Sequence, residues 1–265
     1  EKQTGIVTHF GFGNTVMPSD YSITTIKCDK DGLPWIGAEF TGTLRMTSEG
    51  KWTLLPQLSR DLFERGINII LFTKKGVVWT STLNILARYQ GNIVETFRIN
   101  GSITSLGEDI EGNIWIGTAN YFRAHYEGLV RYDGENWTIY NSSPTGSVPM
   151  AFYPIAADKD GSLWMGGYEG IDYRYTNLVE FDGTDWYVYS PAFCKSPFYI
   201  SEIAIDEAGT KWLATNNGVI AFDGTNWNRC DVLNSQLQSK NVFAIVIDED
   251  GRKWVGTDQG LAVFD

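Results

Sequence analysis

Residues that carry much of enzyme chemistry are scarce in this sequence. Its 265 residues include two histidines, His9 and His125, and three cysteines, Cys28, Cys194 and Cys230. It has no CxxC pair, no Gly-x-Ser-x-Gly and no phosphate-binding glycine loop. These absences argue against a disulfide framework, a zinc ribbon, a nucleotide hydrolase and a serine hydrolase. We expect free thiols, and the sequence leaves open whether Cys194 and Cys230 pair, because pairing needs geometry.

Basic clusters and long apolar runs are also missing. Asp and Glu number 32 against 21 Lys and Arg, a formal net charge of -11. Without a basic patch, we expect no nucleic-acid partner. No run of about 18 apolar residues occurs, so we expect no membrane span in this chain. The chain begins at Glu1 without a signal peptide, as a mature secreted protein or a trimmed chain would.

Tryptophan, by contrast, is frequent and periodic. Each of the ten tryptophans falls into one of two repeating slots. The first slot follows an acidic turn ending in Gly and precedes a short small-residue stretch, as in IWIGT and KWVGT: Trp35, Trp79 (a weaker member), Trp115, Trp164, Trp212 and Trp254. The second slot mostly follows an Asp-Gly turn, as in FDGTNW: Trp52, Trp137, Trp186 and Trp227. A repeat of this kind predicts that most of them are core residues.

The repeat length indicates units of four strands. First-slot tryptophans are 36 to 49 residues apart. In residues 242–265, VFAIVID is a continuous apolar run, which predicts a strand buried on both faces. Asp250-Gly251 predicts a hairpin, KWVGT a second strand and LAVFD a third. In other units an FDG turn leads to a fourth strand such as ENWTIY.

Six such units without helical periodicity predict an all-β fold, a six-bladed β-propeller with one first-slot tryptophan at the centre of each blade. Blade two is degenerate, and Val94 fills its second slot. A seven-bladed ring is the alternative, but no seventh hairpin set is found. We expect a single domain over residues 1–265.

The ends of the chain predict ring closure. The last unit stops after its third strand, whereas residues 1–22 hold GIVTHF and a turn-rich stretch. We expect GIVTHF to supply the missing outer strand of the last blade, because this pairing would remove an exposed sheet edge.

The repeat resembles that of the two-component regulator propeller family, I-x-x-D-x-x-G-x-x-W-I-G-T-x-x-G-L-x-x-F-D. Residues 245–265 (IVIDEDGRKWVGTDQGLAVFD) and 203–223 fit it nearly position by position, and 106–118 also fit. The resemblance covers most of the chain, weakly at 60–100. It describes turns and core, so it is specific for fold and not for function.

Family members are mostly periplasmic sensor regions of Bacteroidetes-type hybrid histidine kinases that respond to oligosaccharides. The resemblance therefore implies a periplasmic or extracellular protein. A surface lipoprotein whose lipid anchor precedes Glu1 is one form of this expectation. The family's second propeller, immunoglobulin-like domain, membrane helix and kinase have no counterpart in this sequence. We expect a free-standing propeller that binds a ligand.

Two units break the repeat. The spacing from first-slot to second-slot tryptophan is 15 residues in blade five and 17 in blade one, but 22 in blades three and four. The extra residues fall between the second and third strands, in TANYFRAHYEG (118–128) and GYEGIDYRYTN (167–177). Such loops emerge on the face of a propeller that surrounds its channel mouth. Neighbouring blades would bring the two insertions together.

The insertions are rich in side chains suited to a small ligand. Tyrosine offers a flat apolar face and a hydroxyl, while Arg and Asp orient hydroxyl groups by charge-assisted hydrogen bonds. An aromatic cleft with a few polar groups is the usual small-ligand site. With the loops between blades, the candidate ligand-binding residues are Tyr121, Arg123, His125, Tyr126, Tyr153, Tyr168, Glu169, Asp172, Tyr173, Arg174, Tyr175 and Tyr199.

Other interpretations stay open. The same side chains favour a contact with another protein or a self-copy, and two aromatic hairpins can also pack on each other. A propeller lyase that acts on cyclic peptide antibiotics has related repeats and uses histidines with a divalent metal. Here His125 is the one weak catalytic candidate, since His9 falls in the closing strand. Asp clusters such as Asp248–Asp250 read as turns, not as calcium loops. We expect no cofactor and no metal.

Overall fold

The computed structural model describes residues 22–38, 42–55, 67–91, 93–119, 128–140, 152–168, 176–191, 198–233, 235 and 237–264. The chain divides into two compact units, residues 1–99 and 100–265. All regular secondary structure in the described ranges is β-strand, arranged in antiparallel sheets whose strands follow chain order. No helix there is long and apolar enough to cross a membrane.

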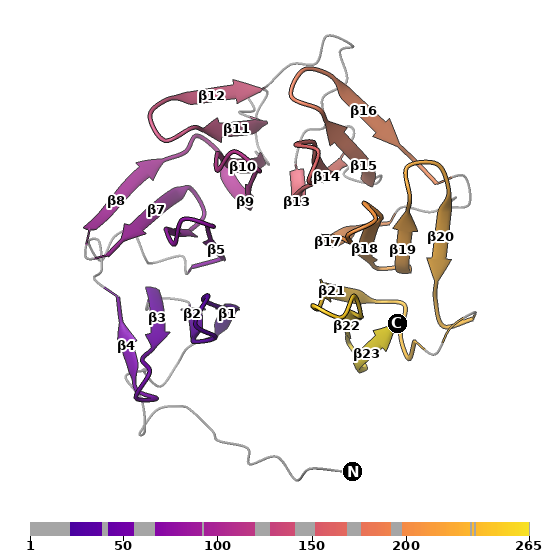
Figure 1. Ribbon diagram of the computed structural model, residues 1–265, viewed down its shortest axis with the longest axis horizontal. Helices are drawn as coiled ribbons and strands as arrows, with labels where there is room; N and C mark the ends of the chain where they lie inside the picture. Colours follow the sequence, from indigo (N-terminus) through magenta and orange to yellow (C-terminus); the bar gives the residue numbers. More distant parts are fainter. Residues whose placement is uncertain are drawn as a thin grey trace. The chain divides into compact units, whose positions relative to one another are not determined.

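The first unit holds two four-stranded sheets (Figure 1). Blade one consists of β1 (Ile23–Cys28), β2 (Pro34–Ala38), β3 (Gly42–Met46) and β4 (Trp52–Leu54). Blade two consists of β5 (Ile69–Phe72), β6 (Val78–Ser81), β7 (Ile85–Gln90) and β8 (Ile93–Arg98). Val94 pairs with Tyr89 as Trp227 pairs with Phe222 in blade five, which confirms the reading of the degenerate blade.

The second unit holds three four-stranded sheets and one three-stranded sheet. Blade three consists of β9 (Ser102–Glu108), β10 (Ile114–Ala119), β11 (Leu129–Tyr132) and β12 (Trp137–Tyr140). Blade four consists of β13 (Phe152–Ala157), β14 (Leu163–Tyr168), β15 (Thr176–Phe181) and β16 (Trp186–Tyr189). Blade five consists of β17 (Ile200–Ile205), β18 (Lys211–Thr215), β19 (Gly218–Phe222) and β20 (Trp227–Cys230). Blade six consists of β21 (Val242–Ile247), β22 (Lys253–Thr257) and β23 (Gly260–Phe264).

These six meander sheets are the blades of a six-bladed β-propeller, as the repeat predicts. Within the second unit the first strands of successive blades are neighbours and lie innermost, whereas β12, β16 and β20 lie outermost (Figure 1). The closing strand predicted from GIVTHF lies outside the described residues. Closure and a single domain over 1–265 stay predictions.

An aspartate ahead of the tryptophan organises four of the blades. In blade three, Asp109 Oδ1 accepts hydrogen bonds from the backbone N–H groups of Glu111 and Asn113 at 3.0 and 2.9 Å. Its Oδ2 accepts one from Trp115 Nε1 at 2.7 Å. One carboxylate thus closes the turn and fixes the ring of the next strand. The same Asp–Trp bond joins Asp29 to Trp35, Asp206 to Trp212 and Asp248 to Trp254.

Blade four departs from this arrangement. Trp164 Nε1 donates to Ser162 Oγ at 3.0 Å, and Asp158 instead forms a buried ion pair with Lys211 Nζ at 2.8 Å. That ammonium also lies 4.1 Å from the Trp164 ring centroid. Lys211 belongs to blade five, so the diverted carboxylate joins two blades. Breaking such a buried pair on one side typically costs about 3–5 kcal/mol.

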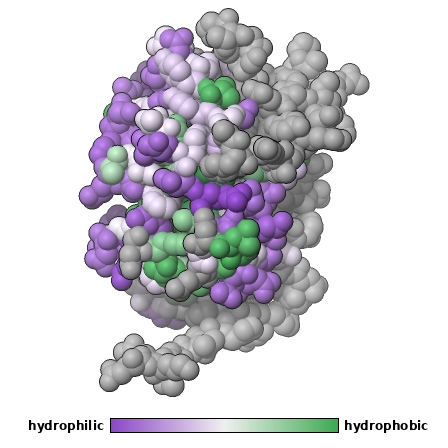
Figure 2. Space-filling model, turned by 90° about the vertical axis from the view of Figure 1, so that its right-hand side faces the viewer, coloured by the Kyte–Doolittle hydropathy of each residue, from purple (hydrophilic) through white to green (hydrophobic). Residues whose placement is uncertain are grey.

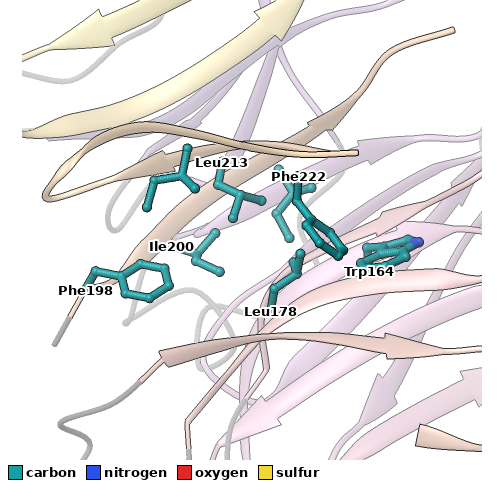
Figure 3. Close-up of a cluster of buried hydrophobic side chains, with 8 residues drawn as sticks. Trp164, Leu178, Phe198, Ile200, Leu213 and Phe222 are labelled. Atoms are coloured by element: carbon teal, nitrogen blue, oxygen red, sulfur yellow. The ribbon is translucent and has the colours of Figure 1, made fainter. Parts of the chain in front are cut away.

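Aromatic triads fill the interfaces between blades. The ring centroid of Tyr140 lies 5.3 Å from that of Trp115 and 5.1 Å from that of Phe181. Tyr189 takes the same place between Trp164 and Phe222, two rings that Figure 3 shows side by side. At the interface between blades five and six the corresponding cluster contains Trp212, Cys230 and Phe264. Cys230 therefore replaces a tyrosine, and burial, with the nearby Asp231 charge, raises the pKa of its free thiol. Cys28 is also a free thiol, and Cys194 lies outside the described ranges.

The tryptophans are less uniformly buried than the repeat predicts. Trp35, Trp52, Trp79, Trp115 and Trp164 are buried. Trp186, Trp212, Trp227 and Trp254 are half-buried, and Trp137 is 37% exposed. The second-slot rings of blades three to five pack on an aromatic residue of the third strand and are only partly covered, because they stand on the outer strand.

The prediction that residues 242–248 are buried on both faces is wrong. Phe243 and Val246 are each 60% exposed, whereas Val242 and Ile245 are buried. Val246 pairs with Trp254, and Trp254 pairs with Val263, so the three side chains lie on one face of the sheet. In blades three to five the following blade covers the corresponding face. Blade six is the last of its unit. On the side turned to the viewer in Figure 2, hydrophobic side chains gather in one part of a mainly hydrophilic surface.

In blade four the glycine of the WIGT-type motif, Gly166, cannot be replaced by a residue with a side chain without a clash. A Cβ on Gly166 would collide with the carbonyl oxygen of Tyr153, whereas one on Gly256, at the same motif position in blade six, would lie 3.6 Å from Ala244 Cβ. We expect Gly166→Ala to lower the free energy of unfolding by about 3 kcal/mol or more, since backbone must shift. Gly256→Ala is the matched control and should change it by less than about 1 kcal/mol. Denaturant unfolding of both variants measures this, and equal effects would contradict the close approach.

The turn aspartates predict acid sensitivity. Burial raises the pKa of Asp29, Asp109 and Asp206, but hydrogen bonds from the tryptophan and the turn outweigh it and hold each pKa below its usual range. The Trp254 hydrogen bond leads the causes that lower the pKa of Asp248 to about 2. The unfolded chain therefore binds more protons in acid, so the stabilisation is complete above about pH 4 and is lost as pH falls toward 2.

The melting temperature between pH 7 and pH 2.5 tests this expectation. It should stay level to about pH 4 and then fall, and Asp109→Asn should lower it at pH 7 while making the acid fall shallower. An acid fall of the same steepness in Asp109→Asn would contradict the role of this carboxylate.

Candidate functional site

The turns between second and third strands are short in blades five and six. Thr215 Oγ1 donates to the Gly218 carbonyl at 2.7 Å, and Thr257 Oγ1 donates to that of Gly260 at 2.9 Å. In each, the threonine hydroxyl also accepts a hydrogen bond from a backbone N–H of the turn. Both glycines have positive φ, which suits a reversal in two residues. We call this threonine–glycine contact the clasp.

Blade three has the same clasp around a longer loop. Thr118 Oγ1 donates to the Gly128 carbonyl at 2.9 Å, and Gly128 has a φ of 68°. Nine residues, 119–127, stand where blade five has Asn216 and Asn217. The clasp is therefore the same in both blades, and blade three has seven more residues between its threonine and its glycine.

In blade four the backbone pairing of the hairpin continues into the first and last residues of the insertion. Gly167 pairs with Asn177 at the clasp position, and one further backbone pair joins Tyr168 to Thr176. Blades three and four are neighbours through β9, β10 and β13, so both insertions start from adjacent blades, as predicted.

Most of the predicted site residues lie outside the described ranges: Tyr121, Arg123, His125, Tyr126, Glu169, Asp172, Tyr173, Arg174 and Tyr175. Tyr168 is described in its backbone alone. Their grouping into one site stays a prediction. In the residues that the structure does describe, no group of three or more His, Cys, Asp or Glu could hold a metal ion.

Two predicted site residues are described, and both stand where a blade begins. Tyr153 is half-buried near the start of β13. Tyr199, just ahead of β17, is 44% exposed, and its backbone N–H donates to Asn216 Oδ1 at 2.8 Å. Its neighbour Phe198 is buried at one end of the cluster in Figure 3. A buried anchor and a turn amide thus hold Tyr199 at the surface.

Blade six repeats this connection with other groups. Asn241, just ahead of β21, donates from Nδ2 to Asp258 Oδ2 at 2.9 Å. Hydrogen bonds from Ser239 and Asn241 lower the pKa of Asp258, so the carboxylate keeps its charge at neutral pH. In both blades the residue after the clasp threonine holds the entry of the first strand.

The start of each inner strand also contains residues that sequence reasoning missed. In blades five and six the pairing skips one residue at the second strand position, Ser201 and Phe243, and both are exposed. A β-bulge leaves no periodic signal in an apolar run. The sequence marks these residues only by their place. Each comes two positions after Tyr199 or Asn241, the residues that bind to the position after the clasp threonine.

Comparison with known proteins identifies the repeat. Residues 98–120 match the family model described as two component regulator propeller. This stretch contains the blade-three aspartate, its turn and Trp115. Residues 98–120 thus match one two-component regulator propeller repeat. No curated protein matches the chain.

Several solved structures share the fold at low sequence identity. PorZ of Porphyromonas gingivalis, an essential bacterial surface component of the type-IX secretion system, is 17% identical with a TM-score of 0.69 over 92% of this chain. The extracellular domain of the hybrid two component system BT4673 of B. thetaiotaomicron is 18% identical with a TM-score of 0.57 over 96%. A catalytically inactive virginiamycin B lyase of Staphylococcus aureus with quinupristin is 15% identical with a TM-score of 0.70 over 96%.

The matched lengths differ among these structures. This chain covers 86% of the lyase chain, but 38% of the PorZ chain and 40% of the BT4673 chain. At these identities the likeness establishes the propeller fold alone.

The clamp on Tyr199 is testable without a ligand. Asn216→Ala removes the acceptor of the Tyr199 N–H, so amide hydrogen exchange at Tyr199 should quicken while stability falls by about 1 kcal/mol. Asn217→Ala is the control, because Asn217 joins the turn through its backbone N–H. Unchanged exchange at Tyr199 in Asn216→Ala would show that this hydrogen bond does not hold it.

Proposed function

We propose that this chain is a non-catalytic, extracytoplasmic ligand-binding propeller of the sensor type. Its ligand is an oligosaccharide or a similar small molecule, and the binding face carries the insertions of blades three and four. The residues that would contact the ligand are the tyrosines and charged residues of 118–128 and 167–177, with Tyr153 and Tyr199 beside them.

The clasp of blade three is the observation that carries this proposal. Blade five closes the same threonine–glycine contact with two residues, whereas blade three uses nine. The clasp itself closes with two residues in blade five, so it does not require nine. Loops that exceed what the fold requires are often functional.

The residue types in the insertions favour a hydroxyl-rich ligand. Together the two segments contain five tyrosines, two arginines and one aspartate among 22 residues. Tyrosine combines a stacking face with a hydroxyl, and Arg and Asp make directional charge-assisted hydrogen bonds. An oligosaccharide offers both apolar ring faces and hydroxyl groups.

The related propellers support a location outside the cytoplasm. BT4673 is represented by an extracellular domain of a hybrid two component system, and PorZ is a bacterial surface component. Periplasmic or extracellular placement and a sensor role follow by analogy of fold.

A contact with another protein or with a second copy is the other candidate. Tyr and Arg are enriched at protein interfaces, and PorZ is a component of a secretion system. Lyase chemistry would rest on fold likeness and on His125 as its single candidate, so it ranks third.

A thermal-shift and calorimetry screen with oligosaccharides tests the proposal. At least one should raise the melting temperature, and Tyr126→Ala and Tyr173→Ala should each weaken binding by about tenfold or more, because each removes a stacking face. Tyr187→Ala is the control, since Tyr187 is exposed on the outer strand β16.

Two results would contradict the proposal. If no oligosaccharide binds and light scattering shows a dimer that Tyr126→Ala and Tyr173→Ala dissociate, the face is a protein interface. If the protein shows metal-dependent turnover that His125→Ala removes, it is an enzyme.

A further inference from the structure

A β-bulge recurs at the start of the innermost strand. In blades one, three, four, five and six the register between first and second strands shifts at this point. Bulges leave a residue outside the ladder and cluster next to binding sites. The residues at this position are Thr24, Thr104, Tyr153, Ser201 and Phe243.

Blades five and six bring two of these positions side by side. The strands β17 and β21 are neighbours, and each is the inner edge of its sheet (Figure 1). Along β17, Ile200 is buried while Tyr199 and Ser201 on either side are exposed. Along β21, Val242 is buried and Phe243 is 60% exposed. An exposed phenyl ring stands where the other blades of this unit have Thr, Tyr or Ser.

A carboxylate joins the two strand edges. Glu202, next to Ser201, accepts a hydrogen bond at Oε2 from the backbone N–H of Ile245 at 3.0 Å. This hydrogen bond joins β17 to β21, which is an edge strand of its sheet. A carboxylate has about four acceptor sites and can also accept from a ligand hydroxyl.

We propose that the adjoining edges of β17 and β21 form a subsite for one sugar ring, an inference that rests on the proposed function. Phe243 stacks on the apolar face of the ring. Ser201 and Glu202 hydrogen-bond to its hydroxyl groups, and Tyr199 lies on the same side of β17 as Ser201. This subsite adds to the insertions of blades three and four.

Charge narrows the ligand class to neutral sugars. Glu202 and the ionised Asp258 stand by the entries of these strands, and the whole chain carries a net charge of -11. A uronic acid or sulfated sugar would be repelled here. The subsite therefore prefers a neutral hexose or pentose unit over an acidic one.

Isothermal titration with neutral hexasaccharides (maltohexaose, mannohexaose and xylohexaose) and with hexagalacturonate tests the subsite. Phe243→Ala should weaken binding of the neutral ligand by about tenfold, and Phe243→Trp should keep it. Glu202→Gln, which retains an acceptor for the Ile245 N–H, should weaken neutral binding severalfold. Val246→Ala is the matched control, because Val246 is equally exposed on the same strand.

The outcomes separate the two proposals. A neutral ligand that binds wild type and Phe243→Ala equally overturns the subsite and leaves the proposed function intact. Tighter binding of hexagalacturonate overturns the assignment to neutral sugars. If wild type binds none of the probes while a wider glycan panel also gives no binding, the proposed function fails, and the subsite with it.

Discussion

The hydrogen bond from a tryptophan indole to an aspartate six residues earlier is the interaction that organises four of the six blades. The carboxylate that accepts it also accepts the turn's backbone N–H groups, as Asp109 does in blade three. The tryptophan ring held in this way packs on aromatic residues of its own outer strand and of the next blade, as Trp115 does with Tyr140 and Phe181. Turn, strand and blade interface thus share one polar anchor.

Variation around this anchor follows the same physics. In blade four, Asp158 forms an ion pair with Lys211 of blade five, and the Trp164 indole donates its hydrogen bond to Ser162 instead. Within blade four, Gly166 must also stay small, because a Cβ there would collide with the carbonyl oxygen of Tyr153 on the neighbouring strand. Blade four therefore keeps a hydrogen-bonded indole without using its aspartate for it.

Periodicity was sufficient to predict much of the fold. The number of blades, the Asp-Gly hairpins and the role of Val94 follow from tryptophan spacing and turn residues, because these features are local. Burial across an interface is not local, so Val246 and Phe243 were misjudged in an apolar run. The bulge that exposes Phe243 has no sequence signature. The insertions were found by spacing, but the arrangement of their side chains depends on contacts that spacing does not encode.

Separation of fold from function is the central claim, with the repeat building the blades and the insertions binding the ligand. The most direct measurement replaces residues 119–127 with the Asn-Asn pair that closes the same clasp in blade five. Scanning calorimetry and oligosaccharide titration are then compared with wild type. We predict a melting temperature within a few degrees of wild type and loss of binding, since the clasp is worth only about 1 kcal/mol per hydrogen bond and is kept. Unchanged binding, or a variant that does not fold, would contradict the account.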